Sequence, residues 1–190
     1  MSEPVRLRVR FLVADTDPIE DPDADPVDDV DLDPVDVDDE EPFDREDVWA
    51  TAVDVERDGS GTYRLESSSF FVPLAAGDLV RAAPDADGEL QVVDVAEPCD
   101  GVLTIFAPDP AASPESVAAL MDIWSVLGAG LSERGGPFVA TVWPDLPMDA
   151  VAAQLNADQE AGRGEWILAA EPHERRREAQ DEIDFSIAGS

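Results

Sequence analysis

The aspartate- and proline-rich run at residues 15–47 constrains the fold more than any other feature of this sequence. It holds eighteen acidic residues against one arginine, Arg45, and five prolines lie between positions 18 and 42. Self-repelling carboxylates and prolines oppose both a helix and a packed strand, so we expect this segment to be a disordered insertion. A folded core therefore has to come from the residues on either side of it.

The insertion is also the first candidate for a binding surface. Its valines and Leu32 leave some apolar character among the carboxylates, which suits transient docking on a basic and partly hydrophobic protein. A solvated segment that serves solubility or salt adaptation is an open alternative. The candidate partner-binding residues are Asp28, Asp29, Asp31, Asp36, Asp38, Asp39, Glu40 and Glu41.

The charge of the whole chain limits its partners. The net charge is −33, and all twelve basic residues are arginines. Phosphate backbones and anionic lipids are also negative, so we expect no direct binding to nucleic acid or to membranes. No segment approaches the roughly twenty apolar residues that span a bilayer, and the start of the chain lacks a signal-peptide core. We therefore expect a cytoplasmic protein that binds a basic protein; the sequence leaves its oligomeric state open.

The residues around the insertion predict a small antiparallel β-meander or barrel. Residues 5–13 alternate arginine with apolar side chains, as a half-buried strand does. Runs of strand formers then follow one another, separated by turn signals such as Asp58-Gly59 and Asp87-Gly88. These predicted strands cover residues 48–55, 62–66, 70–74, 79–82 and 90–95. The first lobe would thus comprise residues 1–14 and 48–98.

The second half of the chain alternates strands with amphipathic helices. Ser113-Pro114-Glu115 is a helix start, and apolar residues recur from position 117 to 131 at three- and four-residue spacing, which predicts a helix that ends around Gly128 or Gly130. Strands are predicted at residues 102–106, 138–143 and 165–169, and a second helix at 148–159. This order predicts an α+β protein whose second lobe, residues 99–170, is a ferredoxin-like βαβαβ half. Residues 171–190 are predicted to be a polar tail, in which a solvated, self-paired helix carries the arginines at 175–177.

Several short motifs in the first lobe resemble a bacterial family known as domain of unknown function 4265. They are Val48-Trp49-Ala50, Tyr63-Arg64-Leu65, Phe70-Phe71-Val72, the turn Ala76-Gly77-Asp78-Leu79-Val80 and the Asp87-Gly88 hairpin. The similarity covers residues 46–170 together with the opening strand. It implies a βαβαβ second half and carries no established reaction. The resemblance marks Trp49, Phe71, Gly77 and Asp78 as the motif residues that we expect to have a structural or a functional role.

Few residues in this sequence are candidates for catalysis or for metal binding. Cys99 is the only cysteine and His173 the only histidine, and His173 lies in the polar tail, so a Cys–His nucleophilic pair is disfavoured. The run from Asp85 to Gly88 matches the opening of a calcium-binding loop, but Ala96 takes the twelfth position, where such a loop needs glutamate. A β-turn explains this run better. We therefore predict no catalytic residue, no specific metal site and no cofactor, and we assign the four tryptophans to packing.

Three functional hypotheses follow from the sequence. The first is an interaction protein of a regulatory or immunity type that binds a basic partner, with binding that weakens as salt rises. The second is an inhibitor that mimics DNA, which requires ordered carboxylates in residues 15–47. The third is an enzyme with a carboxylate site between the two lobes, using carboxylates such as Asp78 and Asp100, which requires two close, buried carboxyl groups with perturbed pKa values.

Overall fold

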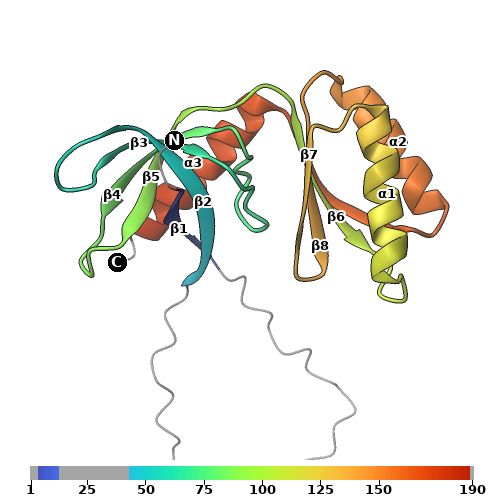
Figure 1. Ribbon diagram of the computed structural model, residues 1–190, viewed down its shortest axis with the longest axis horizontal. Coiled ribbons are helices and arrows are strands. Elements are labelled where there is room, and N and C mark those ends of the chain that lie inside the picture. The colour runs from blue at the N-terminus through green and yellow to red at the C-terminus, as the bar shows by residue number, and fades with distance from the viewer. Residues whose placement is uncertain (1–3, 13–42, 189–190) are drawn as a thin grey trace, which may run out of the picture.

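The computed structural model describes residues 4–12 and 43–188, and it shows an α+β protein of two lobes (Figure 1). A closed five-stranded barrel forms the first lobe, and a four-stranded sheet with two helices forms the second. A third helix returns from the second lobe to the barrel (Figure 1). Within the described residues, no helix is long and apolar enough to cross a membrane.

The barrel is built from strands that are close in sequence. In order around the ring they are β1 (Val5–Leu12), β2 (Phe43–Val55), β3 (Gly61–Leu65), β4 (Leu79–Pro84) and β5 (Leu90–Glu97). Consecutive strands are antiparallel, and a parallel pairing between Arg8 and Gln91 joins β1 to β5 and closes the ring. Alternate side chains point inwards, so Leu7 of β1 and Val48 of β2 share one core. The predicted small barrel is confirmed.

Strand β2 starts earlier than the composition predicts. Residues 43–47 belong to the predicted disordered insertion, yet they pair with β1 in continuous register. Their charges find partners in the fold: Arg6 Nη1 lies 3.0 Å from Asp47 Oδ2, and Glu46 accepts a hydrogen bond from Ser69 Oγ. The prediction of disorder is wrong for these five residues, because cross-strand pairing and these contacts outweigh the local charge repulsion.

The C-terminal helix α3 (Pro172–Ala188) completes the core of the barrel. Ala179 and Ile183 lie one turn apart and are fully buried against the barrel. Gln180 between them accepts a hydrogen bond from Val95 N of β5 at 3.2 Å. The prediction of a polar tail is wrong, because a short apolar stripe on an otherwise polar helix docks on β1 and β5.

The second lobe contains one strand more than the predicted βαβαβ order. Its elements are β6 (Val102–Pro108), α1 (Pro114–Leu127), β7 (Leu131–Gly135), β8 (Phe138–Trp143), α2 (Met148–Glu160) and β9 (Gly164–Ala170). The strands form an antiparallel sheet in the order β7-β8-β6-β9. Sequence reasoning missed β7 because the apolar spacing of α1 continues to Leu131. The helix itself ends at Gly128, one of its two predicted ends, in the left-handed conformation with φ 113°.

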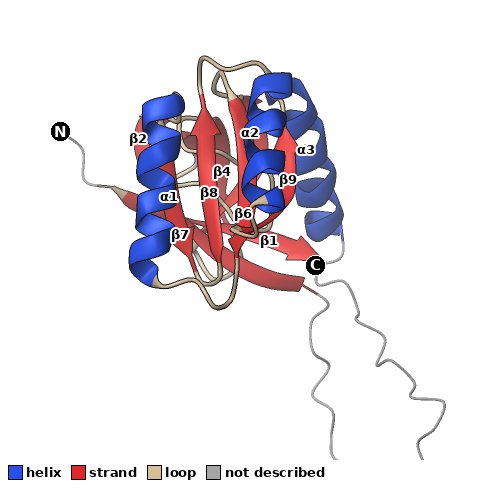
Figure 2. Ribbon diagram, turned by 90° about the vertical axis from the view of Figure 1, so that its right-hand side faces the viewer, coloured by secondary structure: helices blue, strands red, loops and turns tan. Residues whose placement is uncertain are grey.

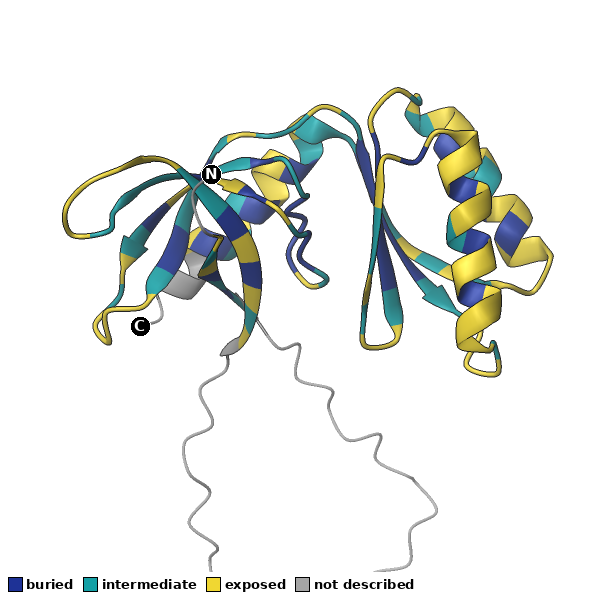
Figure 3. Cartoon of the chain, viewed as in Figure 1, coloured by how far each residue is buried: buried dark blue, intermediate teal, exposed yellow. Residues whose placement is uncertain are grey.

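Each face of this sheet is covered by a different part of the chain. Helices α1 and α2 lie across one face (Figure 2), where Phe106, Trp124 and Trp143 pack together in the core. The other face packs against a loop of the barrel lobe, through Phe70 and Ala75. Buried positions accordingly lie on both faces of the sheet as well as inside the barrel (Figure 3). The two lobes therefore share a buried apolar layer.

That loop includes residues 70–74, which were predicted to be a strand. Ser69 Oγ accepts a hydrogen bond from Val72 N at 3.0 Å, and a serine that bonds its own neighbours gives the backbone an alternative to a strand ladder. The loop places the ring of Phe70 directly over Gly135 of β7. A β-carbon at position 135 would clash with this ring, so the absence of a side chain there allows the lobes to approach closely.

Candidate functional site

The eight acidic residues predicted to bind a partner, from Asp28 to Glu41, lie outside the described residues. The structure does place the two points at which their segment joins the fold. Leu12 at the end of β1 pairs with Phe43 at the start of β2. The described residues on either side of the acidic segment therefore lie next to each other, at the same end of β1 and β2 (Figure 1).

The four residues of the family-like motifs lie in different environments. Trp49 of β2 and Phe71 of the inter-lobe loop are 50% and 56% exposed. Phe71 makes an edge-on ring contact with Phe138 beside an apolar cleft of about 320 Å³. Gly77 takes a positive φ of 97° in the turn before β4, and Asp78 next to it is fully buried. Gly77 and Asp78 thus lie together in the turn before β4, whereas Trp49 lies on β2 and Phe71 on the loop between the lobes.

Asp78 and Arg175 form a buried ion pair, although the prediction placed Arg175 on a solvated helix. Both side chains are 1% exposed, and Arg175 Nη1 lies 2.8 Å from Asp78 Oδ2. The carboxylate also accepts hydrogen bonds from Ala75 N (2.8 Å) and Cys99 N (2.7 Å). Arg175 Nη2 donates to Cys99 O at 2.8 Å. These bonds connect the turn before β4, helix α3 and the segment between the lobes, which is residues 98–101 and links β5 to β6.

Cys99 lies in this cluster as a protonated thiol. Burial, followed by the negative charge of Asp78, raises its pKa to about 11, and Sγ donates a hydrogen bond to Ala76 O at 3.3 Å. A thiol with this pKa is a poor nucleophile at neutral pH. His173 is exposed on α3, and no described contact joins it to Cys99. Asp100, the second carboxylate of the enzyme hypothesis, is exposed and has no described contact with Asp78.

A second buried carboxylate, Asp158 of α2, organises the helical face of the second lobe. It is fully buried and accepts hydrogen bonds from Trp124 Nε1 of α1 (2.7 Å), Gln154 Nε2 (3.0 Å) and Arg163 Nη1 (2.5 Å). Asp158 therefore fixes the spacing between α1, α2 and the turn that leads into β9. Sequence reasoning missed it, because an aspartate is normally assigned to the exposed face of a helix.

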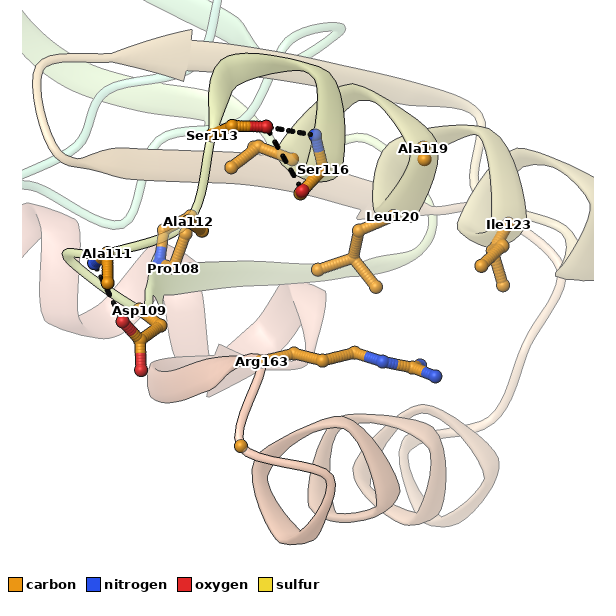
Figure 4. A pocket seen from close by; sticks show the side chains of 12 residues that line it. Pro108, Asp109, Ala111, Ala112, Ser113, Ser116, Ala119, Leu120, Ile123 and Arg163 are labelled. Carbon is orange, nitrogen blue, oxygen red and sulfur yellow. Dashed lines mark hydrogen bonds between the residues drawn. The ribbon is translucent and has the colours of Figure 1, made fainter.

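Beside this carboxylate, a groove of about 730 Å³ runs between α1 and the turn after α2 (Figure 4). Much of its lining is hydrocarbon, from Pro108, Ala112, Val117, Ala119, Leu120 and Ile123. The side chain of Arg163 lies opposite Leu120 and Ile123 (Figure 4). At one end Ser113 caps α1 by accepting a hydrogen bond from Ser116 N at 3.2 Å, and the two hydroxyls contact each other.

The groove continues into exposed apolar side chains on α1. Ile123, Val126 and Leu127 are exposed, and Val126 is 88% exposed. Val126 and Leu127 lie three and four residues after Ile123, so each is its neighbour on the helix surface, and Ile123 also lines the groove. Within α1 only Glu115 and Asp122 are charged, so the helix is apolar around more of its circumference than one buried face requires. These additional apolar residues are visible in the sequence, but the prediction of a helix with one apolar face did not account for them.

Acidic side chains dominate the helical layer around the groove. The segments that form it, residues 108–127 and 144–163, contain seven acidic residues and one arginine, Arg163. Arg163 is itself paired with the buried Asp158. An apolar groove in such a setting repels anionic ligands and attracts cationic ones.

Two partly buried glutamates hold the loop between the lobes. Glu46 of β2 accepts a hydrogen bond from Phe70 N (3.0 Å), and Glu133 of β7 accepts one from Ser68 N (2.8 Å). Burial raises the pKa of both carboxyl groups above the ordinary glutamate value, and these hydrogen bonds oppose part of the rise. The loop is therefore held from both lobes by groups that bind a proton more readily than exposed glutamates do.

We expect the free energy of unfolding to rise as the pH falls from about 7 to about 5. The pKa values of Glu46 and Glu133 are higher in the folded state than in the unfolded chain. Their stabilising contribution is therefore complete below the unfolded pKa and is lost as the pH rises through the folded pKa. Asp58 and Glu115, whose pKa values are lowered by hydrogen bonds, act in the opposite direction at still lower pH.

Urea unfolding at both pH values checks this expectation. The matched control is the double variant Glu46→Gln/Glu133→Gln, which keeps an oxygen acceptor at each position and removes the titration. The rise in stability should be smaller in this variant than in the natural chain. An equal rise in both proteins would show that other carboxylates cause it.

Comparisons with known proteins bear on the fold. No family model matches the chain, and no curated protein matches it. A solved structure described as a novel crystal structure of a hypothetical protein from Neisseria gonorrhoeae is similar, with a TM-score of 0.54 and 15% sequence identity. The similarity covers 90% of this chain and 98% of that chain, so it extends over both lobes. At this identity it shows the fold alone.

Proposed function

We propose that this chain is an interaction protein, of a regulatory or immunity type, that binds a basic protein partner. The observation that supports this most strongly is the apolar groove beside α1, which lies in an acidic helical layer and continues into exposed hydrocarbon. Exposed apolar surface with a polar rim is typical of protein-binding sites. The acidic surroundings favour partners of opposite charge.

The ion pairs that the arginines make within the fold also support this proposal. At least five of them make ion pairs within the chain: Arg6, Arg8, Arg81, Arg163 and Arg175. Because these five arginines are already paired within the fold, they do little to offset the other carboxylates. The net charge of −33 can therefore attract a basic partner. A field of this sign speeds the approach of a basic protein and weakens as salt rises.

Four further predictions accompany this proposal. The acidic residues between Asp28 and Glu41 would be a second contact region, joined to the barrel rim. The second lobe would be ferredoxin-like, which the order β6-α1-β7-β8-α2-β9 and the placement of both helices on one face support. Membership of the domain of unknown function 4265 family and a cytoplasmic location stay predictions.

The two other functional hypotheses have less support among the described residues. DNA mimicry depends on residues 15–47, of which residues 15–42 lie outside that part of the chain. The enzyme hypothesis needs two close, buried carboxyl groups, whereas Asp78 is paired with Arg175 and Asp100 is exposed.

Affinity capture from host lysate, with the full chain as bait, tests the proposal at about 0.05 M and about 0.5 M salt. We expect a basic protein that is captured at low salt and released at high salt. Purified, it should bind the chain in calorimetric titration with the same salt dependence. Capture of acidic or neutral proteins alone, or binding that salt does not weaken, would contradict the proposal.

The contribution of the acidic segment is measured in the same assay. One variant carries amides in place of the eight candidate carboxylates between Asp28 and Glu41. The matched control carries amides at eight exposed acidic positions elsewhere: Asp54, Glu56, Asp58, Glu66, Asp87, Glu97, Glu178 and Asp181. A greater loss of capture in the first variant assigns the segment to the interface, and an equal loss in both assigns it only a share of the overall charge.

A further inference from the structure

The groove and the exposed side chains beside it form one surface, which we call the α1 groove surface and define by Ala119, Leu120, Ile123, Val126 and Leu127. Ala119, Ile123 and Val126 follow one another at four- and three-residue spacing on the exposed side of α1. This run spans about 10 Å at 1.5 Å per residue. A partner helix presents anchoring side chains at the same interval when it places positions i, i+4 and i+7 in a groove.

The polar side chains in the groove already have partners within the chain. Asp109 Oδ1 accepts a hydrogen bond from Ala111 N at 2.7 Å, and Ser113 is occupied in capping α1. Arg163 donates to the buried Asp158. A small polar ligand needs convergent polar groups that are free to bind it. The arrangement therefore suits apolar side chains of a protein better than a polar metabolite.

Charge decides between a second copy of this chain and a different protein. A second copy would bring an equally acidic helical layer against this one, and each chain carries a net charge of −33. Like charges brought together at an interface are destabilising. A partner with lysine or arginine beside its apolar positions would instead meet Glu115 and Asp122 of α1 with opposite charge.

Resting on the function proposed above, we propose that the α1 groove surface binds an amphipathic helix of the basic partner. The apolar face of that helix fills the groove and covers Ile123 and Val126, and its flanking basic residues face the acidic side chains of the helical layer. Binding thus requires both an apolar face and positive charge.

The probe is a synthetic helical peptide of about 18 residues, built from leucine on one face and lysine on the other. Two control peptides separate the requirements. A scrambled peptide of the same composition keeps the charge and lacks the apolar face, and a leucine–glutamate peptide keeps the face and reverses the charge. Binding to the full chain is measured by calorimetry, and the site is located from amide shifts in nuclear magnetic resonance spectra.

Paired variants test the location. Ile123→Lys/Val126→Lys places two positive charges on the α1 groove surface, and Val53→Lys/Val55→Lys makes the same change at exposed aliphatic positions of β2. We expect the first variant to weaken binding of the leucine–lysine peptide about tenfold or more. The second should stay within about threefold of the natural chain, because it changes the overall charge equally and leaves the groove intact.

The outcomes separate this inference from the proposed function. Peptide binding that is sensitive to salt but equal in both variants, or equal for the scrambled peptide, overturns the inference and leaves a basic partner in place. No binding of the leucine–lysine peptide overturns the inference alone, because the lysate capture tests the basic partner separately. Equal binding of the leucine–glutamate peptide overturns the inference on charge grounds and counts against a basic partner as well. Self-association that Ile123→Lys/Val126→Lys abolishes would make a second copy the occupant and would also overturn the inference.

Discussion

Replacing Arg175 with methionine is expected to lower the free energy of unfolding by about 3–5 kcal/mol. The substitution leaves the Asp78 carboxylate buried without its counter-ion, and it removes the hydrogen bond to Cys99 O. Breaking one half of a buried ion pair is strongly destabilising, because the remaining carboxylate has lost its solvation and keeps only the hydrogen bonds from Ala75 N and Cys99 N in its place. The same change frees α3 from the segment between the lobes, so the barrel should lose its C-terminal cover at lower urea concentration.

Urea unfolding measures this effect, and Arg176→Met is the matched control. Arg176 follows Arg175 on the same helix and is exposed, so its loss should change stability by no more than about 0.5 kcal/mol. The double variant Asp78→Asn/Arg175→Met should lose less than the two single variants together, because it removes both charges of the pair. A loss below about 1 kcal/mol for Arg175→Met would mean that water reaches Asp78 and that the pair is not a buried anchor.

Replacing Asp158 with alanine is expected to lower the free energy of unfolding by about 2–4 kcal/mol. The change leaves the Trp124 indole N–H buried without an acceptor and removes the acceptor for Gln154 and Arg163. Because Arg163 is about half exposed, its own ion pair adds little, and the buried tryptophan accounts for most of the effect. The spacing between α1 and the turn after α2 should loosen as well.

The control for this variant is Glu160→Ala, two residues further along α2 and exposed. Its effect should stay within about 0.5 kcal/mol. Tryptophan fluorescence of the folded protein supplies a second measurement, since the indole of Trp124 should change its environment in Asp158→Ala and not in Glu160→Ala. Equal stability of the two variants would contradict the structural role given to Asp158.

Local patterns in the sequence predicted much of the barrel and of the helical layer. Alternation identified the first strand, runs of strand formers between turn signals identified the next ones, and the cap at Ser113 identified the start of α1, since all of these depend on neighbours within a few residues. Elements that depend on distant partners were missed or misjudged. Strand β7 has a partly polar sequence and is defined by pairing with β8, and residues 43–47 become a strand through pairing with β1.

The candidate site was harder to predict from the sequence for the same reason. The sequence marked Asp78 as a turn residue, which it is, but its ion-pair partner is Arg175, which was predicted to lie on a solvated helix and to pair with acidic residues near it in sequence. The groove arises only when α1 packs beside the turn after α2, with Asp158 setting the distance. The exposed apolar side chains of α1 were visible as an excess of hydrocarbon on a helix with two charges.

The position of α3 affects how this protein can form during synthesis. All five barrel strands are synthesised first, and the whole second lobe follows. Helix α3, which supplies Ala179 and Ile183 to the barrel core, is synthesised last. A ribosome-bound chain with five complete strands would thus still have an open core, and the second lobe would have every element of its own sheet before that core closes. We therefore expect the second lobe to reach its final structure on the ribosome before the lobe that is translated first.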